Sequence, residues 1–93
     1  MPIPGLTKEQ LTIIRGFFPQ GCDVKLFGSR VTGNFRENSD LDVCILSGLS
    51  RSSVTEIIDY FEESDLPFTV DVVLYRDCSA DFKKIIDSTG VRL

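Results

Sequence analysis

Three aspartates are the residues of this 93-residue chain whose types and spacing could do chemistry. Asp40 and Asp42 lie two residues apart at the start of an apolar run, and Asp71 interrupts another such run, from Phe68 to Tyr75. Because side chains alternate along a strand, Asp40 and Asp42 project in the same direction. Carboxylates gathered in one place repel one another and are costly to bury, and a divalent cation resolves both problems. The pattern therefore predicts a metal site.

The available ligand types indicate which metal such a site would bind. The chain has no histidine, and its three cysteines form no Cys-x-x-Cys pair, so the usual zinc ligands are missing. Oxygen ligands alone favour Mg²⁺, with Mn²⁺ as the alternative, and Mg²⁺ is usually held by one or two carboxylates together with substrate phosphates. The lack of histidine also excludes Ser-His-Asp and Cys-His mechanisms, which leaves acid–base chemistry to carboxylates.

A polar turn ahead of these carboxylates has the composition of a phosphate-binding loop. Gly28 permits a tight turn and a close approach of backbone to ligand, and Ser29 can begin a short helix whose free N–H groups face an anion. Arg30, with Arg36 as a second candidate, could add positive charge. Each feature alone occurs more often as an ordinary turn or surface charge. The indication comes from their combination, in which Gly28 and Ser29 are followed after ten residues by Asp40.

Helices must position these residues, and capping residues followed by apolar stripes predict where they lie. The expected longer helices run from Lys8 to Pro19, from a cap at Ser50 or Ser53 through Phe61, and from a cap at Ser79 to Gly90. In the last helix we expect Phe82, Ile85 and Ile86 to face inward.

Strands are predicted at three places. Residues 22–27 alternate, residues 41–46 are apolar on both sides after Asp42 as in a central strand, and residues 68–75 form a β-branched and aromatic run. Residues 91–93 could add a short edge strand. The resulting order is helix, strand, short helix, strand, helix, strand, helix, which predicts an α/β or α+β fold around one sheet.

Length and composition predict a single domain covering residues 1–93. The apolar fraction of 42% and the charged fraction of 26% are typical of folded soluble domains. A formal net charge of −4 without a run of Lys or Arg disfavours nucleic acid as a partner. No apolar run approaches the roughly 20 residues of a membrane span, and residues 1–5 lack a signal-peptide layout. We therefore expect a cytoplasmic protein without membrane contact.

The combined motif resembles the nucleotidyltransferase superfamily related to DNA polymerase beta. Gly28 and Ser29, followed after ten residues by the Asp-Leu-Asp of residues 40–42, match its signature, and Asp71 matches its third carboxylate. Residues 28–33, 39–43 and 85–93 look like the minimal nucleotidyltransferase branch, whose members are about this size. The resemblance implies a nucleotidyltransferase fold, with a small mixed sheet of three to four strands flanked by helices.

The resemblance also implies an activity and a set of site residues. The reaction would be nucleotidyl transfer with ATP as substrate and two Mg²⁺ ions, and paired metals can stabilise both the attacking and the leaving oxygen. The implied metal and catalytic residues are the three aspartates, with Asp71 sharing one metal and helping to activate the acceptor hydroxyl. The implied nucleotide-binding residues are Gly28, Ser29, Arg30 and Ser39.

The implied partner is a toxin. Members of this branch are often antitoxins encoded beside a helical HEPN-domain ribonuclease, and some transfer AMP to a tyrosine of that toxin, so the resemblance implies a hetero-oligomer with a HEPN-type protein. Thr32 departs from the family at a position where a second arginine is common, which leaves the nucleotide preference open. Two other hypotheses remain: a module that neutralises its partner by binding alone, and a structural or oligomerising domain with Asp71 at an exposed edge.

Overall fold

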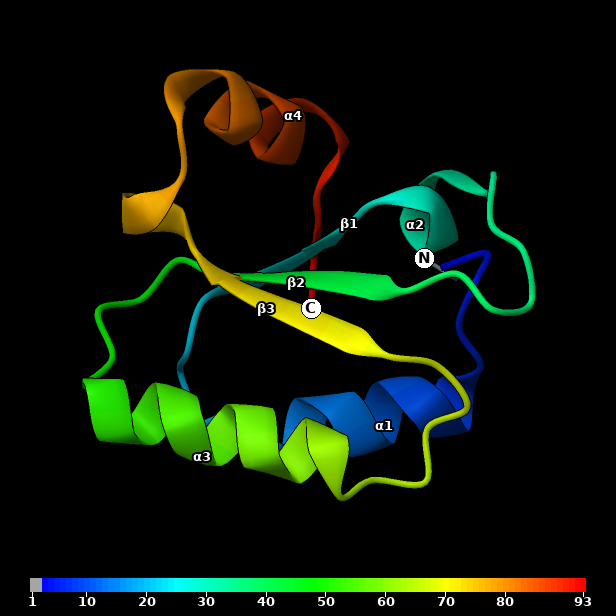
Figure 1. The fold of residues 1–93 in the computed structure, drawn as a ribbon, viewed down its shortest axis with the longest axis horizontal. Coiled ribbons are helices and arrows are strands. Elements are labelled where there is room, and N and C mark those ends of the chain that lie inside the picture. The colour runs from blue at the N-terminus through cyan, green and yellow to red at the C-terminus, as the bar shows by residue number, and fades with distance from the viewer. Residues whose placement is uncertain (1–2) are drawn as a thin grey trace.

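The computed structural model describes residues 3–93 and consists of one sheet with helices on both faces (Figure 1). Its elements are α1 (Lys8–Gly16), β1 (Val24–Phe27), α2 (Ser29–Thr32), β2 (Leu41–Ile45), α3 (Arg51–Glu62), β3 (Val70–Leu74), the 3-10 helix η1 (Tyr75–Asp77), α4 (Ala80–Thr89) and β4 (Val91–Arg92). The predicted order of helices and strands is therefore confirmed. No helix in this part of the chain is long and apolar enough to cross a membrane.

The sheet is mixed and has four strands in the order β3-β2-β1-β4. β2 pairs in parallel with β3 and antiparallel with β1, and β1 also pairs antiparallel with β4. The prediction of a central strand at residues 41–46 is confirmed, as is the short edge strand at the end of the chain. The predicted mixed α/β fold with a small sheet flanked by helices is confirmed as well.

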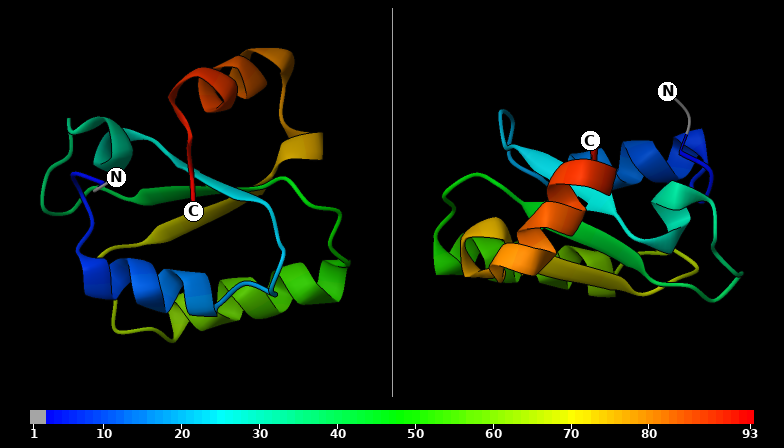
Figure 2. Two further views of the ribbon diagram at one scale, coloured as in Figure 1. Left: turned by 180° about the vertical axis from the view of Figure 1, so that it is seen from behind. Right: turned by 90° about the horizontal axis from the view of Figure 1, so that it is seen from above.

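The helices form two layers of unequal size. α1 and α3 lie side by side on one face of the sheet, and α4 lies on the other (Figures 1 and 2). The larger core lies under α1 and α3, where Ile14 and Ile57 pack with Leu41 and Val43. The smaller core, of Phe27, Cys44 and Ile86, lies under α4. Because alternate residues of a strand face opposite sides, Asp42, which lies between Leu41 and Val43, faces the α4 layer.

The helix starts follow the predicted capping signals. Thr7 and Gln10 form a capping box at the start of α1, and the Ser79 side chain accepts a hydrogen bond from the Phe82 amide at the start of α4. Of the two candidate caps for α3, Ser50 is the one used, since its hydroxyl accepts a hydrogen bond from the Ser53 amide. All three helices are thus fixed at their N-termini by side chains that the sequence identifies.

The prediction for the inner face of α4 is wrong in part. Ile86 is fully buried and the Phe82 ring packs edge-on against Phe27, although 39% of Phe82 is exposed; Ile85, at 52% exposure, is the residue that does not face inward as expected. The reason is that α4 is alone on its side of the sheet, so only one narrow stripe of the helix is covered. Residue 75 was expected to be in a strand but begins η1, a turn that carries the chain from β3 up to α4 (Figure 1).

Candidate active site

A tight turn after β1 brings the glycine of the motif against the first carboxylate-bearing strand. Gly28 has a φ of +90°, a conformation that side-chain-bearing residues rarely adopt, and it is the N-cap of α2. A Cβ placed on Gly28 would overlap the Oδ2 oxygen of Asp42. The turn therefore needs glycine for two reasons, its backbone conformation and its contact with the carboxylate.

The short helix α2 begins at this turn. The Gly28 carbonyl accepts hydrogen bonds of 3.1 Å from the amides of Val31 and Thr32. The amides of Ser29 and Arg30 come first in the helix and lack an intrahelical acceptor. They lie where the predicted phosphate-binding loop requires free N–H groups.

The register of the sheet brings two of the three aspartates together. Asp42 is paired with Phe27 on β1 and with Asp71 on β3. Asp42 and Asp71 are therefore direct neighbours on two parallel strands and face the α4 side, where α4 leaves the start of both strands uncovered (Figure 2). Asp40 is exposed and directly precedes β2.

The electrostatics of Asp42 reflect this crowding. Burial, followed by the negative charges of Asp71 and Asp40, raises the pKa of Asp42 to about 6. A carboxylate with a raised pKa among like charges is stabilised by a cation. The donor set consists of three carboxylates, and the sequence has no histidine that could add a nitrogen ligand. These donors thus fit a hard divalent ion.

The three carboxylates do not converge on one point as the side chains stand. Within residues 3–93, no group of three or more acidic or cysteine side chains has the arrangement of a metal site. Asp40 and Asp71 are both exposed, so their side chains are free to change rotamer. The backbone places the ligands on neighbouring strands, and a bound cation would have to draw the carboxylates together.

Arg30 has a different role from the phosphate contact proposed from sequence. It is only 6% exposed, and its guanidinium donates hydrogen bonds to three carbonyl oxygens, those of Gly5 (2.8 Å), Glu37 (2.9 Å) and Ser39 (2.7 Å). Its Cζ lies 4.1 Å from the centre of the Phe68 ring. Arg30 therefore braces the loop that leads to Asp40, and its buried side chain is not presented to a ligand.

Ser39 also shapes this loop. Its hydroxyl accepts a hydrogen bond of 2.8 Å from the Arg36 amide, and its own amide donates one of 3.0 Å to the Arg36 carbonyl. These bonds close the turn directly before Asp40. A contact between Ser39 and nucleotide stays a prediction, and Arg36 is exposed on the loop.

Sequence reasoning missed the ring that covers Arg30 and the carbonyls that it binds. The sequence pattern predicts that Phe68 lies in a strand and indicates no role for Gly5 beyond the N-terminal segment. Backbone carbonyls leave no signature in a sequence. The one available signal is the arginine itself, between Ser29 and Val31, which is compatible with a buried brace as well as with a phosphate ligand.

The Gly28 turn provides a first test of the site. We expect Gly28→Ala to lower the free energy of unfolding by about 1–3 kcal/mol, because the alanine is strained at this φ and its Cβ meets Asp42. Gly48→Ala is the matched control, since a Cβ there has no neighbour within 4 Å and Gly48 is not at positive φ. Urea unfolding of both variants measures the difference. Equal midpoints would contradict the proposed strain.

Comparisons with known proteins place these features in a family. Residues 23–93 match the family model described as "Polymerase beta, Nucleotidyltransferase". The chain is 37% identical over 89 residues to the probable protein adenylyltransferase MntA of Haemophilus influenzae, an alignment that covers 87% of this chain and 75% of the relative.

Two solved structures share the fold. One, described as a toxin-antitoxin with AMP-PNP, is 26% identical, with a TM-score of 0.66 and coverage of 88% of this chain and 67% of the other. The second, a mutant MntA-HpeT toxin-antitoxin, has a TM-score of 0.68 at 23% identity and covers 94% and 72% of the two chains. The second likeness shows the fold alone.

Proposed function

Since this chain belongs to the polymerase beta nucleotidyltransferase family, we propose that it transfers AMP from ATP to a hydroxyl of a partner toxin and thereby acts as an antitoxin. The observation that carries the proposal is the pairing of Asp42 with Asp71 beside the Gly28 turn. The named relative is a probable protein adenylyltransferase, and one structural neighbour was crystallised with AMP-PNP, an ATP analogue. Both support AMP as the transferred group and ATP as its source.

The site has two sides. On the β1 side, Gly28 and Ser29 offer backbone to a triphosphate; on the β3 side, Asp71 is exposed toward whatever receives the nucleotide. Asp42 lies between them in the sheet. Nucleotide and acceptor would therefore approach from opposite sides of Asp42.

The chemistry proposed is an in-line displacement at the α-phosphorus. The acceptor oxygen forms a bond to this phosphorus while the bond to the bridging α–β oxygen breaks, and pyrophosphate leaves with that electron pair. We propose that Asp71 accepts the proton of the acceptor hydroxyl. Mg²⁺ held by Asp40, Asp42 and Asp71 would supply charge neutralisation at the attacking and leaving oxygens.

The acceptor is proposed to be a tyrosine of a HEPN-type helical toxin bound in a hetero-oligomer. The structural neighbour that is 26% identical is a toxin-antitoxin structure, which supports a toxin partner. We propose that residues 1–93 act as one minimal nucleotidyltransferase domain in the cytoplasm. The macromolecular partner would then contribute the acceptor surface.

Labelled ATP tests this function directly. Incubating the chain with α-labelled ATP, Mg²⁺ and the protein encoded by the neighbouring gene should label that protein, and omitting Mg²⁺ should abolish the label. Mass spectrometry should then find AMP on a tyrosine. Absence of transfer under all these conditions would contradict the proposal.

One observation favours a second candidate function, neutralisation by binding alone. The three carboxylates do not form a ready metal site among residues 3–93. Replacing all three with asparagine separates the two functions: a variant that folds and still protects cells from the toxin favours stoichiometric binding. Loss of protection with binding retained favours catalysis.

A further inference from the structure

The outer edge of β3 has no strand beside it. β3 is the first strand in the order β3-β2-β1-β4, and its only neighbour in the described sheet is β2. An exposed strand edge presents a row of N–H and C=O groups that can pair with another extended chain. This edge lies in the open between the layer of α3 and the layer of α4 (Figure 1).

The groups that face outward can be assigned from one hydrogen bond. The Thr69 carbonyl accepts a hydrogen bond of 2.9 Å from the Leu41 amide and so points toward β2. Because successive residues of a strand direct their backbone groups to opposite sides, those of Val70 and Val72 point away from the sheet. No backbone hydrogen bond outside the sheet engages them within residues 3–93. Two residues of β3 therefore offer unpaired donors and acceptors at its edge.

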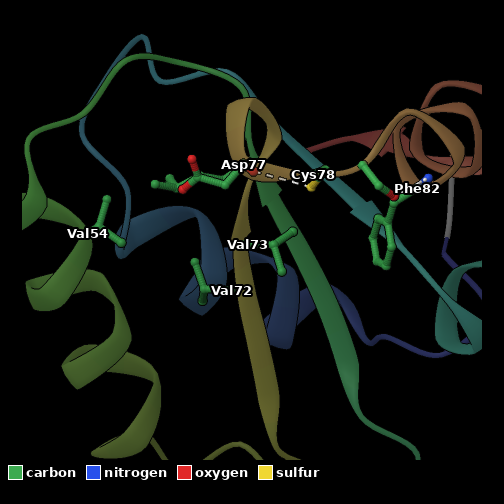
Figure 3. A pocket seen from close by; sticks show the side chains of 8 residues that line it. Val54, Val72, Val73, Asp77, Cys78 and Phe82 are labelled. Atoms are coloured by element: carbon green, nitrogen blue, oxygen red, sulfur yellow. Dashed lines mark hydrogen bonds between the residues drawn. The ribbon is translucent and has the colours of Figure 1, made fainter.

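Two open pockets follow the same edge. One, of about 500 Å³, is lined by Val54, Val73 and Phe82, among others, and the second, of about 440 Å³, is lined by Ile58, Phe68 and Asp71. Val72 lines both, so the pockets meet on β3. Val72 and Val73 point to opposite sides of the strand (Figure 3). The edge is thus flanked by one mainly apolar groove and one with a mixed polar and apolar lining, and side chains on either side of an added strand could enter them.

The charged side chains that line the two pockets all have one sign. The charged residues that line the two pockets are Glu62, Asp71 and Asp77, and neither pocket is lined by Lys or Arg. Asp71 is the carboxylate placed on the acceptor side of the proposed site. The edge therefore continues into the site and favours an occupant that carries basic side chains.

We infer that the edge of β3 binds an extended, basic segment of the protein that receives the nucleotide. The segment adds a strand to the sheet through Val70 and Val72, places apolar side chains in the two grooves, and presents its acceptor hydroxyl near Asp71. Main-chain pairing of this kind provides affinity, and the alternate side chains provide specificity. The inference rests on the proposed function for the role of the hydroxyl.

A second copy of this chain is a poorer occupant. Pairing two β3 edges around a two-fold axis would bring the same three acidic residues of each copy together. The chain also carries a net charge of −4, which opposes self-association at such a surface. The charge pattern thus selects a partner of opposite sign.

The test uses the full chain and a synthetic peptide of seven residues in which lysine and valine alternate around a central tyrosine. Nuclear magnetic resonance should show that the peptide slows hydrogen exchange of the outward Val70 and Val72 amides. The same peptide with alternate amides N-methylated should not bind. Glu62→Lys combined with Asp77→Lys should weaken binding about tenfold, because one acidic side chain in each of the two grooves becomes basic.

A matched pair of variants controls for net charge. Glu63→Lys combined with Asp65→Lys changes the charge equally at exposed positions that do not line the pockets, and should alter affinity by less than about twofold. Failure of the peptide to bind, equal binding of the N-methylated peptide, or a dimer paired through β3 would overturn the inference. The proposed function is judged separately. If the peptide pairs with β3 but no AMP is transferred to the toxin, the proposed function is wrong. If AMP is transferred but hydrogen exchange of the Val72 amide is not slowed, the inferred binding at the β3 edge is wrong.

Discussion

Asp42→Asn should lower AMP transfer at least about a thousandfold while leaving the fold intact. Asp42 is the central carboxylate of the site, paired with Asp71 in the sheet and in contact with the Gly28 turn. An amide supplies neither the charge nor the second oxygen that a divalent ion requires. Losing a few kcal/mol of metal-dependent stabilisation of the transition state corresponds to this factor, since about 1.4 kcal/mol is tenfold in rate.

At high pH, Asp42→Asn should be more stable than the wild type. The pKa of Asp42 is raised from 3.8 to about 6, mainly by burial and then by Asp71 and Asp40. The protonated form therefore favours folding, and this contribution is present below about pH 4 and is lost as pH rises through about 6. Because Asp42 is partly open to solvent, we discount the effect to about 1 kcal/mol at pH 8, or roughly 4–8 °C in melting temperature.

Thermal melts across pH 4 to 8 measure this difference. Without metal, the Asn variant should melt above the wild type at pH 8 and together with it near pH 4. Added Mg²⁺ should raise the melting temperature of the wild type but not of the variant. Asp59→Asn, at an exposed position of α3, is the control and should match the wild type throughout. A variant that transfers AMP normally would refute the assigned role of Asp42.

The sequence predicts the fold well because its signals are local. The Thr7 capping box, the Ser79 cap and the alternation of residues 22–27 each depend on neighbours within a few positions. The pairing of Asp42 with Asp71 was predicted only as a gathering of carboxylates. The structure adds that the two lie opposite each other on parallel strands and that β3 is at the edge.

What the sequence could not provide depends on contacts between distant segments. The inward face of α4 is narrower than predicted, because helical periodicity indicates a stripe but not how much of it a partner layer covers. Ile85 is therefore exposed, whereas Phe82 is only partly covered by its contact with Phe27. Arg30 was assigned to phosphate because its charge is visible in the sequence. Its three carbonyl partners are not, since any residue carries a carbonyl.

Arg30 provides the second large effect. Arg30→Met should lower the free energy of unfolding by about 3 kcal/mol, because three carbonyls in a buried setting lose a charged donor at once. The melting temperature should fall by roughly 12–24 °C. Arg36→Met, on the exposed part of the same loop, removes an equal charge and should change stability by less than about 0.5 kcal/mol.

Arg30→Lys separates the brace from a phosphate ligand. A lysine keeps the positive charge, so a site that needs only charge near the triphosphate would bind ATP normally and the protein would remain stable. An ammonium group cannot reproduce the planar fork that reaches Gly5, Glu37 and Ser39 together, nor the stacking on Phe68. We therefore expect Arg30→Lys to unfold at nearly as low a urea concentration as Arg30→Met. The loop before Asp40 then loses its support, so ATP binding weakens because the carboxylate is displaced and not because a charge is missing.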